Sequence, residues 1–242
     1  MSSFLGMDVK TAGSELEPKS GTVVAIDGPA GAGKSTLARE LARRLGLPYV
    51  NTGMMYRALA KRALARGVDP DDPTGLASLI EGNRFSLGRS ASYGEELMID
   101  GEPPADSLSS LEVESIVSRV ARHAAVRTLM RREQRHLGVG GSVMEGRDIG
   151  TVVFPDADLK IYLSAEPVVR AQRRETERGG GGDVAEAVAR RDEQDARTNP
   201  LEPAWDANVL DTTELARQEV LAEAMRLFEA RAKDSRSGGG SA

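Results

Sequence analysis

The segment Gly28–Ser35 carries the strongest chemical signal in the chain, because it matches the phosphate-binding pattern G-x-x-x-x-G-K-[ST]. Glycines at these spacings let successive backbone N–H groups point into one concavity, and the start of a following helix adds partial positive charge there. Lys34 can reach the outer phosphates of a nucleotide, and the Ser35 hydroxyl can ligate a metal ion. The segment therefore predicts a nucleoside triphosphate site with Mg²⁺ as cofactor. The alternative is a glycine-rich turn without a ligand.

Composition narrows the classes of partner. The chain has 242 residues, a net charge of −5 and no cysteine. The two signs of charge are mixed, which disfavours a nucleic acid polymer as partner, and two histidines without cysteine make a zinc cluster implausible. No apolar run approaches the ~20 residues that span a bilayer, and the N-terminus lacks the features of a secretory signal. We expect a cytoplasmic monomer that binds small molecules and no membrane.

Apolar runs and helical patterns alternate along the chain, and this alternation predicts an α/β fold of three layers around a five-stranded parallel sheet. The expected strands cover 23–27, 48–50, 142–145, 159–163 and 208–210. The expected helices cover 34–45, 52–65, 111–121, 124–137 and 214–230, with Thr212 or Thr213 capping the last one and a further Arg-rich helix ending at Gly179–Gly182. Two short β-like pieces within 84–101 indicate a hairpin-bearing insert. Residues 1–20 and 234–242 are expected to be disordered tails around one domain, 21–233.

Polar segments follow the first three expected strands: the phosphate loop, Asn51–Gly53 and Gly146–Asp148. In parallel sheets with right-handed crossovers, ligands bind at the carboxyl ends of the strands. The three segments are therefore expected to meet in one cleft.

Two of these segments separate this chain from other proteins with such a loop. Residues 51–57 have the sequence N-T-G-M-M-Y-R, and residues 145–155 have the sequence E-G-R-D-I-G-T-V-V-F-P. Together with I-D-G-P at 26–29, they closely resemble the bacterial cytidylate kinase family of nucleoside monophosphate kinases, over about residues 21–230. The resemblance implies a P-loop kinase fold with a monophosphate-binding insert at about 84–116 and a mobile lid at about 170–192. It also implies transfer of the γ-phosphoryl group of ATP to CMP or dCMP.

The resemblance also implies roles for individual residues. Lys34, Arg57, Arg147 and Arg191 would be catalytic, and Ser35 would hold the metal. The residues expected at ATP are Gly28, Pro29, Ala30, Gly31, Ala32, Gly33, Lys34, Ser35, Thr36 and Arg173. The residues expected at CMP are Thr52, Arg57, Ser118, Arg127, Arg147, Asp148, Arg191 and Asp195. Within this set Asp148 would accept a hydrogen bond from the cytosine amine, where uracil offers a carbonyl.

Other interpretations of these residues stay open at this point. Arg57 could be a solvated helix residue, Arg147 and Asp148 could pair with each other, and Ser118 and Arg127 could be ordinary polar helix residues. The acceptor could be another monophosphate such as UMP, or the chain could bind nucleotides without turnover.

The chain departs from the family pattern at three places. Asn51 stands where the family most often has Asp, so a charge is absent there. The segment from Asp195 to Leu201 is two residues shorter than the usual pattern, which puts a phosphate-binding role for Arg197 in doubt. Residues 107–110 lack a common Ile-Arg-like pair, so the insert is expected to pack differently.

Overall fold

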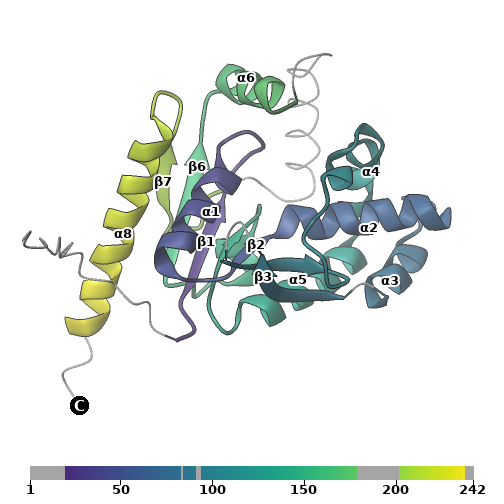
Figure 1. Ribbon diagram of the computed structural model, residues 1–242, viewed down its shortest axis with the longest axis horizontal. Helices are drawn as coiled ribbons and strands as arrows, with labels where there is room; N and C mark the ends of the chain where they lie inside the picture. The colour runs from purple at the N-terminus through teal and green to yellow at the C-terminus, as the bar shows by residue number, and fades with distance from the viewer. Residues whose placement is uncertain (1–19, 83, 91–93, 179–201, 238–242) are drawn as a thin grey trace, which may run out of the picture.

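A seven-stranded sheet with the strand order β3-β4-β2-β5-β1-β6-β7 forms the centre of the computed structural model (Figure 1), which describes residues 20–82, 84–90, 94–178 and 202–237. The strands are β1 (Val23–Asp27), β2 (Tyr49–Asn51), β3 (Phe85–Ser90), β4 (Gly94–Ile99), β5 (Ser142–Glu145), β6 (Leu159–Ser164) and β7 (Asn208–Asp211). The α-helices in the described residues are α1 (Lys34–Leu45), α2 (Thr52–Arg66), α3 (Pro73–Glu81), α4 (Leu111–Ala121), α5 (Ala124–Gly138), α6 (Pro167–Arg178) and α8 (Arg217–Ser237). A short 3₁₀ helix, η1 (Asp106–Ser109), and a π-helix, η2 (Ile149–Val153), complete the elements of the described residues.

The sheet is mostly parallel, but the prediction of five strands was wrong. Strands β2, β5, β1, β6 and β7 are the five expected ones, and they pair in parallel. Strands β3 and β4 form the expected antiparallel hairpin, but β4 also pairs in parallel with β2 at Tyr49 and Glu96. The hairpin therefore extends the main sheet. It covers the edge of β2, whose backbone groups would otherwise lack partners on that side.

Two hydrophobic cores lie on the two faces of the sheet. Alternate residues of β1 point to opposite faces, so Val24 and Ile26 contact α1 and α8, whereas Ala25 lies in the core beneath α2 and α5. Figure 1 shows this layered arrangement, with α8 and α1 on one side of the central strands and α2 to α5 on the other. Both faces are covered, and this explains why β1, β5 and β6 are almost continuously apolar.

Most predicted helices are confirmed, with differences at their ends. Helix α1 has the predicted bounds, while α3 was missed although Asp72 caps it and Pro73 occupies its first turn. Helix α8 begins at Arg217, not at residue 214, and it extends to Ser237, into the predicted C-terminal tail. Thr212 does not cap it: its buried hydroxyl donates to the carbonyl oxygens of Ala32 and Ser164, so it links the end of β7 to the phosphate loop.

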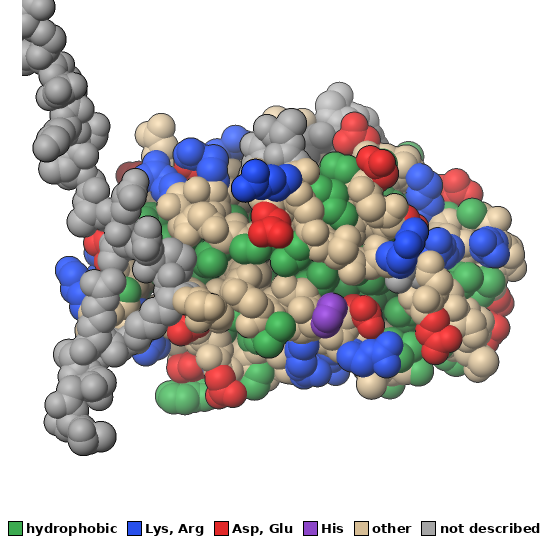
Figure 2. All heavy atoms as spheres, turned by 60° about the horizontal axis from the view of Figure 1, so that its bottom comes forward, with side chains coloured by type: hydrophobic (Ala, Val, Ile, Leu, Met, Phe, Trp, Pro, Cys, Tyr) green, Lys and Arg blue, Asp and Glu red, His purple; other side chains and the backbone are tan. Residues whose placement is uncertain are grey.

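The surface shows no segregation of charge on the face in Figure 2, where Lys and Arg side chains are interspersed with Asp and Glu side chains. No helix within the described ranges has the length and apolar character that crossing a membrane requires. The predicted N-terminal tail lies outside the described residues, apart from Ser20.

Candidate active site

The phosphate loop connects β1 to α1, as the motif requires. Gly28 has φ of 144°, and a Cβ at this position would lie 2.2 Å from the carbonyl oxygen of Leu163 on β6, so only glycine fits between the two strands. Gly33, with φ of 93°, is the N-cap of α1 and leaves the first N–H groups of the helix facing the loop. The Lys34 ammonium donates a hydrogen bond of 2.8 Å to the carbonyl oxygen of Pro29, inside its own loop. The loop thus has the conformation of an anion site.

Glu145, at the end of β5, connects the phosphate loop to the neighbouring strand. The residue is 3 % exposed, and its carboxylate accepts a hydrogen bond from the Ser35 hydroxyl at 3.0 Å. Its other oxygen accepts the Tyr49 hydroxyl at 2.5 Å, and Asn51 in turn donates to Tyr49 at 3.1 Å. Since the Ser35 hydroxyl donates its hydrogen to Glu145, its lone pairs remain available to a cation.

The start of α2 is held against the same strand. Asn51 is the N-cap of α2 and accepts the Met54 N–H at 3.2 Å, so Thr52 does not cap the helix that it begins. Thr52 instead donates its hydroxyl to the Glu145 carbonyl oxygen at 2.8 Å. A capping hydrogen bond needs a side-chain acceptor but no charge, and Asn51 satisfies that need where the family pattern has Asp.

Arg57 is buried, so the interpretation of a solvated helix residue was wrong. Its side chain is 6 % exposed, and its guanidinium donates to the Glu114 carboxylate at 2.8 Å and to the Leu108 carbonyl oxygen at 3.1 Å. These bonds join α2 to η1 and α4.

A buried carboxylate on β1 anchors the segment that follows β5. Asp27 accepts the backbone N–H groups of Ile149 at 2.9 Å and Gly150 at 2.7 Å. Burial raises the pKa of Asp27 to about 6, although the two N–H donors act in the opposite direction. The Arg147 guanidinium donates to the carbonyl oxygen of Gly28, the residue directly after Asp27. The end of β1 therefore holds the chain on both sides of Asp148.

Asp148 pairs with an arginine that the sequence interpretation did not consider. The Arg131 guanidinium donates two hydrogen bonds to one oxygen, Oδ2, at 3.0 Å from Nε and 2.6 Å from Nη2. The two side chains are 22 % and 16 % exposed. The salt bridge of Asp148 is thus with Arg131 on α5, whereas the alternative expectation was a pair with Arg147.

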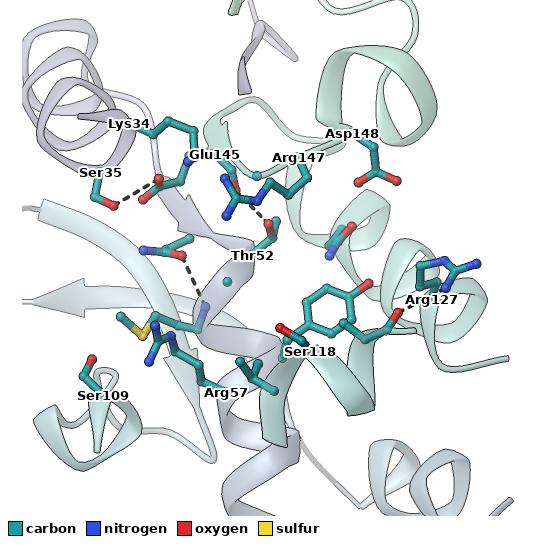
Figure 3. A pocket seen from close by; sticks show the side chains of 18 of the residues that line it. Lys34, Ser35, Thr52, Arg57, Ser109, Ser118, Arg127, Glu145, Arg147 and Asp148 are labelled. Carbon is teal, nitrogen blue, oxygen red and sulfur yellow. Dashed lines mark hydrogen bonds between the residues drawn. The ribbon is translucent and has the colours of Figure 1, made fainter. Parts of the chain in front are cut away.

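One pocket brings most of the predicted residues together (Figure 3). Its lining includes the predicted residues Lys34, Ser35, Thr52, Arg57, Ser118, Arg127, Arg147 and Asp148. In Figure 3, Lys34, Ser35 and Glu145 lie at one end, Asp148 and Arg127 lie at the other, and Arg147 lies between them. The three motifs, which are far apart in the sequence, thus meet in a single cleft over the carboxyl ends of β1, β2 and β5.

Arg173 is not among the residues that line this pocket. Arg173 donates to the hydroxyl of Thr212 at 2.9 Å and to its carbonyl oxygen at 2.5 Å, and its helix neighbour Arg174 lines the pocket instead. Arg191 and Asp195 lie outside the described residues, as does Arg197.

Sequence reasoning also missed residues that support or line the cleft. Arg170 is buried and donates to the Ala30 carbonyl oxygen at 3.2 Å, which ties α6 to the phosphate loop. Gln134 and Tyr56 line the pocket, and burial raises the pKa of the Tyr56 hydroxyl well above its usual value. Gln134 lies on the buried face of α5 with Val126 and Met130. A polar residue on the apolar face of a predicted helix is the sequence signal that could have identified it.

Comparison with known proteins places the chain in a family. The family model described as cytidylate kinase matches residues 24–230. The chain belongs to the cytidylate kinase family. A cytidylate kinase from Rhodococcus opacus (strain B4) is 44% identical over 212 residues, which cover 84% of this chain and 92% of that protein. A cytidylate kinase from Geobacillus kaustophilus (strain HTA426) is 44% identical over 217 residues, covering 86% of this chain and 96% of that protein.

The family also includes longer proteins. A bifunctional pantoate ligase/cytidylate kinase from Prochlorococcus marinus (strain MIT 9303) is 42% identical over 216 residues, and the match covers 85% of this chain but 44% of that protein. The chain thus spans less than half the length of such bifunctional relatives.

Proposed function

We propose that the protein transfers the γ-phosphoryl group of ATP to CMP or dCMP, giving ADP and CDP or dCDP. The observation that carries this proposal is that Lys34, Arg57, Arg147 and Asp148 line one pocket in a chain of the cytidylate kinase family. In this proposal the loop of Lys34 would bind the triphosphate of ATP, and Asp148 would accept a hydrogen bond from a donor group on the base.

The chemistry needs cations and positioning, but no general base. The second ionisation of a monophosphate lies near pH ~6, so its oxygen is already a nucleophile at neutral pH. That oxygen attacks the γ-phosphorus, and the bond from γ-phosphorus to the β,γ-bridging oxygen breaks as ADP leaves. Lys34 and Arg147 would neutralise charge on the phosphoryl group as it moves, and Arg57 would hold the acceptor phosphate.

The residues present fit a magnesium ion. Mg²⁺ prefers oxygen ligands and retains several waters, and the Ser35 hydroxyl has lone pairs available because its hydrogen goes to Glu145. When bound, the ion neutralises charge on the ATP phosphates. Ser35 would hold it directly, and Glu145 would orient Ser35.

The remaining assignments in the proposal rest on the resemblance to the family. The phosphate loop, from Gly28 to Thr36, would hold ATP. Thr52, Ser118 and Arg127 would contact CMP, and Arg191 and Asp195 would join them from outside the described residues. Residues 84–116 would act as the monophosphate-binding insert and 170–192 as a lid, in a cytoplasmic monomer.

A steady-state assay of ADP formation with a panel of acceptors tests the proposal. With ATP and Mg²⁺, we expect the fastest turnover with CMP and dCMP, slower turnover with UMP, and little with AMP or GMP. Lys34→Ala should abolish turnover without unfolding the protein, which excludes a contaminating kinase as the source of activity. Preference for AMP or GMP would contradict the proposal, and binding of ATP and CMP without ADP formation would show a non-catalytic module.

A further inference from the structure

A buried acceptor without a partner lies in the wall of the cleft. Gln134 on α5 is 2 % exposed and lines the same pocket as Arg127 and Asp148. Its carboxamide oxygen Oε1 is buried and accepts no hydrogen bond from any of the described residues. A buried amide oxygen without a donor is unfavourable, so such a group next to a pocket points to a donor that arrives with the ligand.

Asp148 supplies a second acceptor in the same pocket. Arg131 directs both of its hydrogen bonds to Oδ2 of Asp148, and neither goes to Oδ1. Arg131 thereby fixes the carboxylate through one oxygen and leaves the other for a ligand.

Helix α5 links the two acceptors. Arg127, Arg131 and Gln134 are spaced so that they share one side of this helix, and residues three or four apart on a helix are neighbours. Gln134 thus lies about one turn from the residue that holds Asp148. A single ligand group that satisfies both acceptors would carry two hydrogens.

We propose that Gln134 is a specificity-determining residue that accepts one N–H of the exocyclic amine of the acceptor base, while Asp148 accepts the other. This inference rests on the proposed function, and it identifies the amine of cytosine as the group that the pocket recognises. Phosphate and carbonyl oxygens of a nucleotide are acceptors, so they cannot satisfy Gln134 Oε1. The ribose hydroxyls are the other donors of CMP, and the experiment separates them from the amine.

The test measures equilibrium binding of CMP and of an analogue in which hydrogen replaces the exocyclic amine, by calorimetry, with the wild type and with Gln134→Met. Methionine keeps the length of the side chain but accepts hydrogen bonds only weakly. We expect Gln134→Met to weaken CMP binding by about 3- to 10-fold, the size of one hydrogen bond, and to leave binding of the analogue and of ATP unchanged. An equal loss for CMP and the analogue would overturn the proposal, because the lost contact would then be with another part of the nucleotide.

Two further variants complete the design. Ser142→Ala is the matched control, since Ser142 also has a buried hydroxyl with no hydrogen-bond partner among the described residues but does not line the pocket. It should alter neither affinity. Gln134→Glu keeps an acceptor at the same position and should retain the preference for CMP over the analogue. Loss of that preference would contradict the inference.

Thermal unfolding without nucleotide is the second readout. Because Gln134 Oε1 has no partner in the described part of the protein, Gln134→Met should unfold no more easily than the wild type. A clear fall in melting temperature would show that the oxygen serves the fold and would overturn the proposal. Failure of the wild type to bind or phosphorylate CMP would instead refute the proposed function itself.

Discussion

Glu145→Gln is the substitution that most sharply tests how the strand next to the phosphate loop prepares the metal site. The carboxylate accepts two hydroxyl hydrogens, from Ser35 at 3.0 Å and from Tyr49 at 2.5 Å, one on each oxygen. A carboxamide of the same shape has one acceptor oxygen and one NH₂ group. One of the two hydroxyls must therefore lose its acceptor and face a donor.

The structure sets the expected magnitude. Loss of one hydrogen bond to a charged group costs about 1.5–3 kcal/mol, or roughly one to two powers of ten in an equilibrium constant. If a lone pair of the Ser35 hydroxyl accepts from the new NH₂ group, that lone pair can no longer bind the cation. Loss of such an outer contact weakens metal binding by about 10- to 100-fold. We expect MgATP affinity to fall by this factor, while the affinity for ATP in the presence of a chelator stays near that of the wild type.

Calorimetric titration of ATP with and without Mg²⁺ provides the assay, and Tyr49→Phe is the matched control. The control removes the bond to the other oxygen of Glu145 but leaves the bond from Ser35 intact. Tyr49→Phe should therefore lower the stability of the protein without changing the difference in affinity between MgATP and free ATP. Equal weakening of ATP binding by Glu145→Gln with and without Mg²⁺ would refute this role of Glu145. The same Mg²⁺-dependent loss of affinity in Tyr49→Phe would refute it as well.

Two more predictions concern the carboxylates of Asp148 and Asp27. Asp148→Asn should reduce the preference for CMP over UMP by about 1–3 kcal/mol in kcat/KM, because an amide can face the uracil carbonyl that a carboxylate repels; an unchanged ratio would remove Asp148 from base recognition. The pKa of Asp27 is raised from 3.8 to about 6, so the folded protein binds a proton more tightly than the unfolded chain does, and the stability linked to this group falls as pH rises from about 4 to about 6. The free energy of unfolding of the wild type, relative to Asp27→Asn, should therefore drop by up to about 3 kcal/mol between pH 4 and pH 7 in urea titrations, and a constant difference would contradict the raised pKa.

Local sequence signals predicted the elements that carry the site. The apolar run before Gly28 and the helical pattern after Lys34 gave β1 and α1 with the observed bounds, because both depend on short-range periodicity and on glycine conformation. The three segments after β1, β2 and β5 meet in one cleft because parallel strands end on the same edge of a sheet.

Features that depend on distant contacts were not predictable in the same way. The hairpin joins the main sheet through β4 and β2, a pairing between segments that no local pattern connects. The partner of Asp148 is Arg131, which a sequence search could find only by knowing that α5 packs beside η2. Whether Arg173 or Arg174 lines the pocket depends on the rotation of α6, because consecutive residues of a helix point about 100° apart.

In the proposed reaction, ATP and CMP occupy one cleft with their phosphates facing each other across Lys34 and Arg147. Binding of an adenosine and a cytidine joined through their 5′ positions by an oligophosphate tests this arrangement most directly. If both sites share the cleft, the joined compound should bind about 10²-fold more tightly than ATP or CMP alone, or better, and should compete with both. An affinity no better than that of ATP, or displacement of ATP without displacement of CMP, would contradict the account.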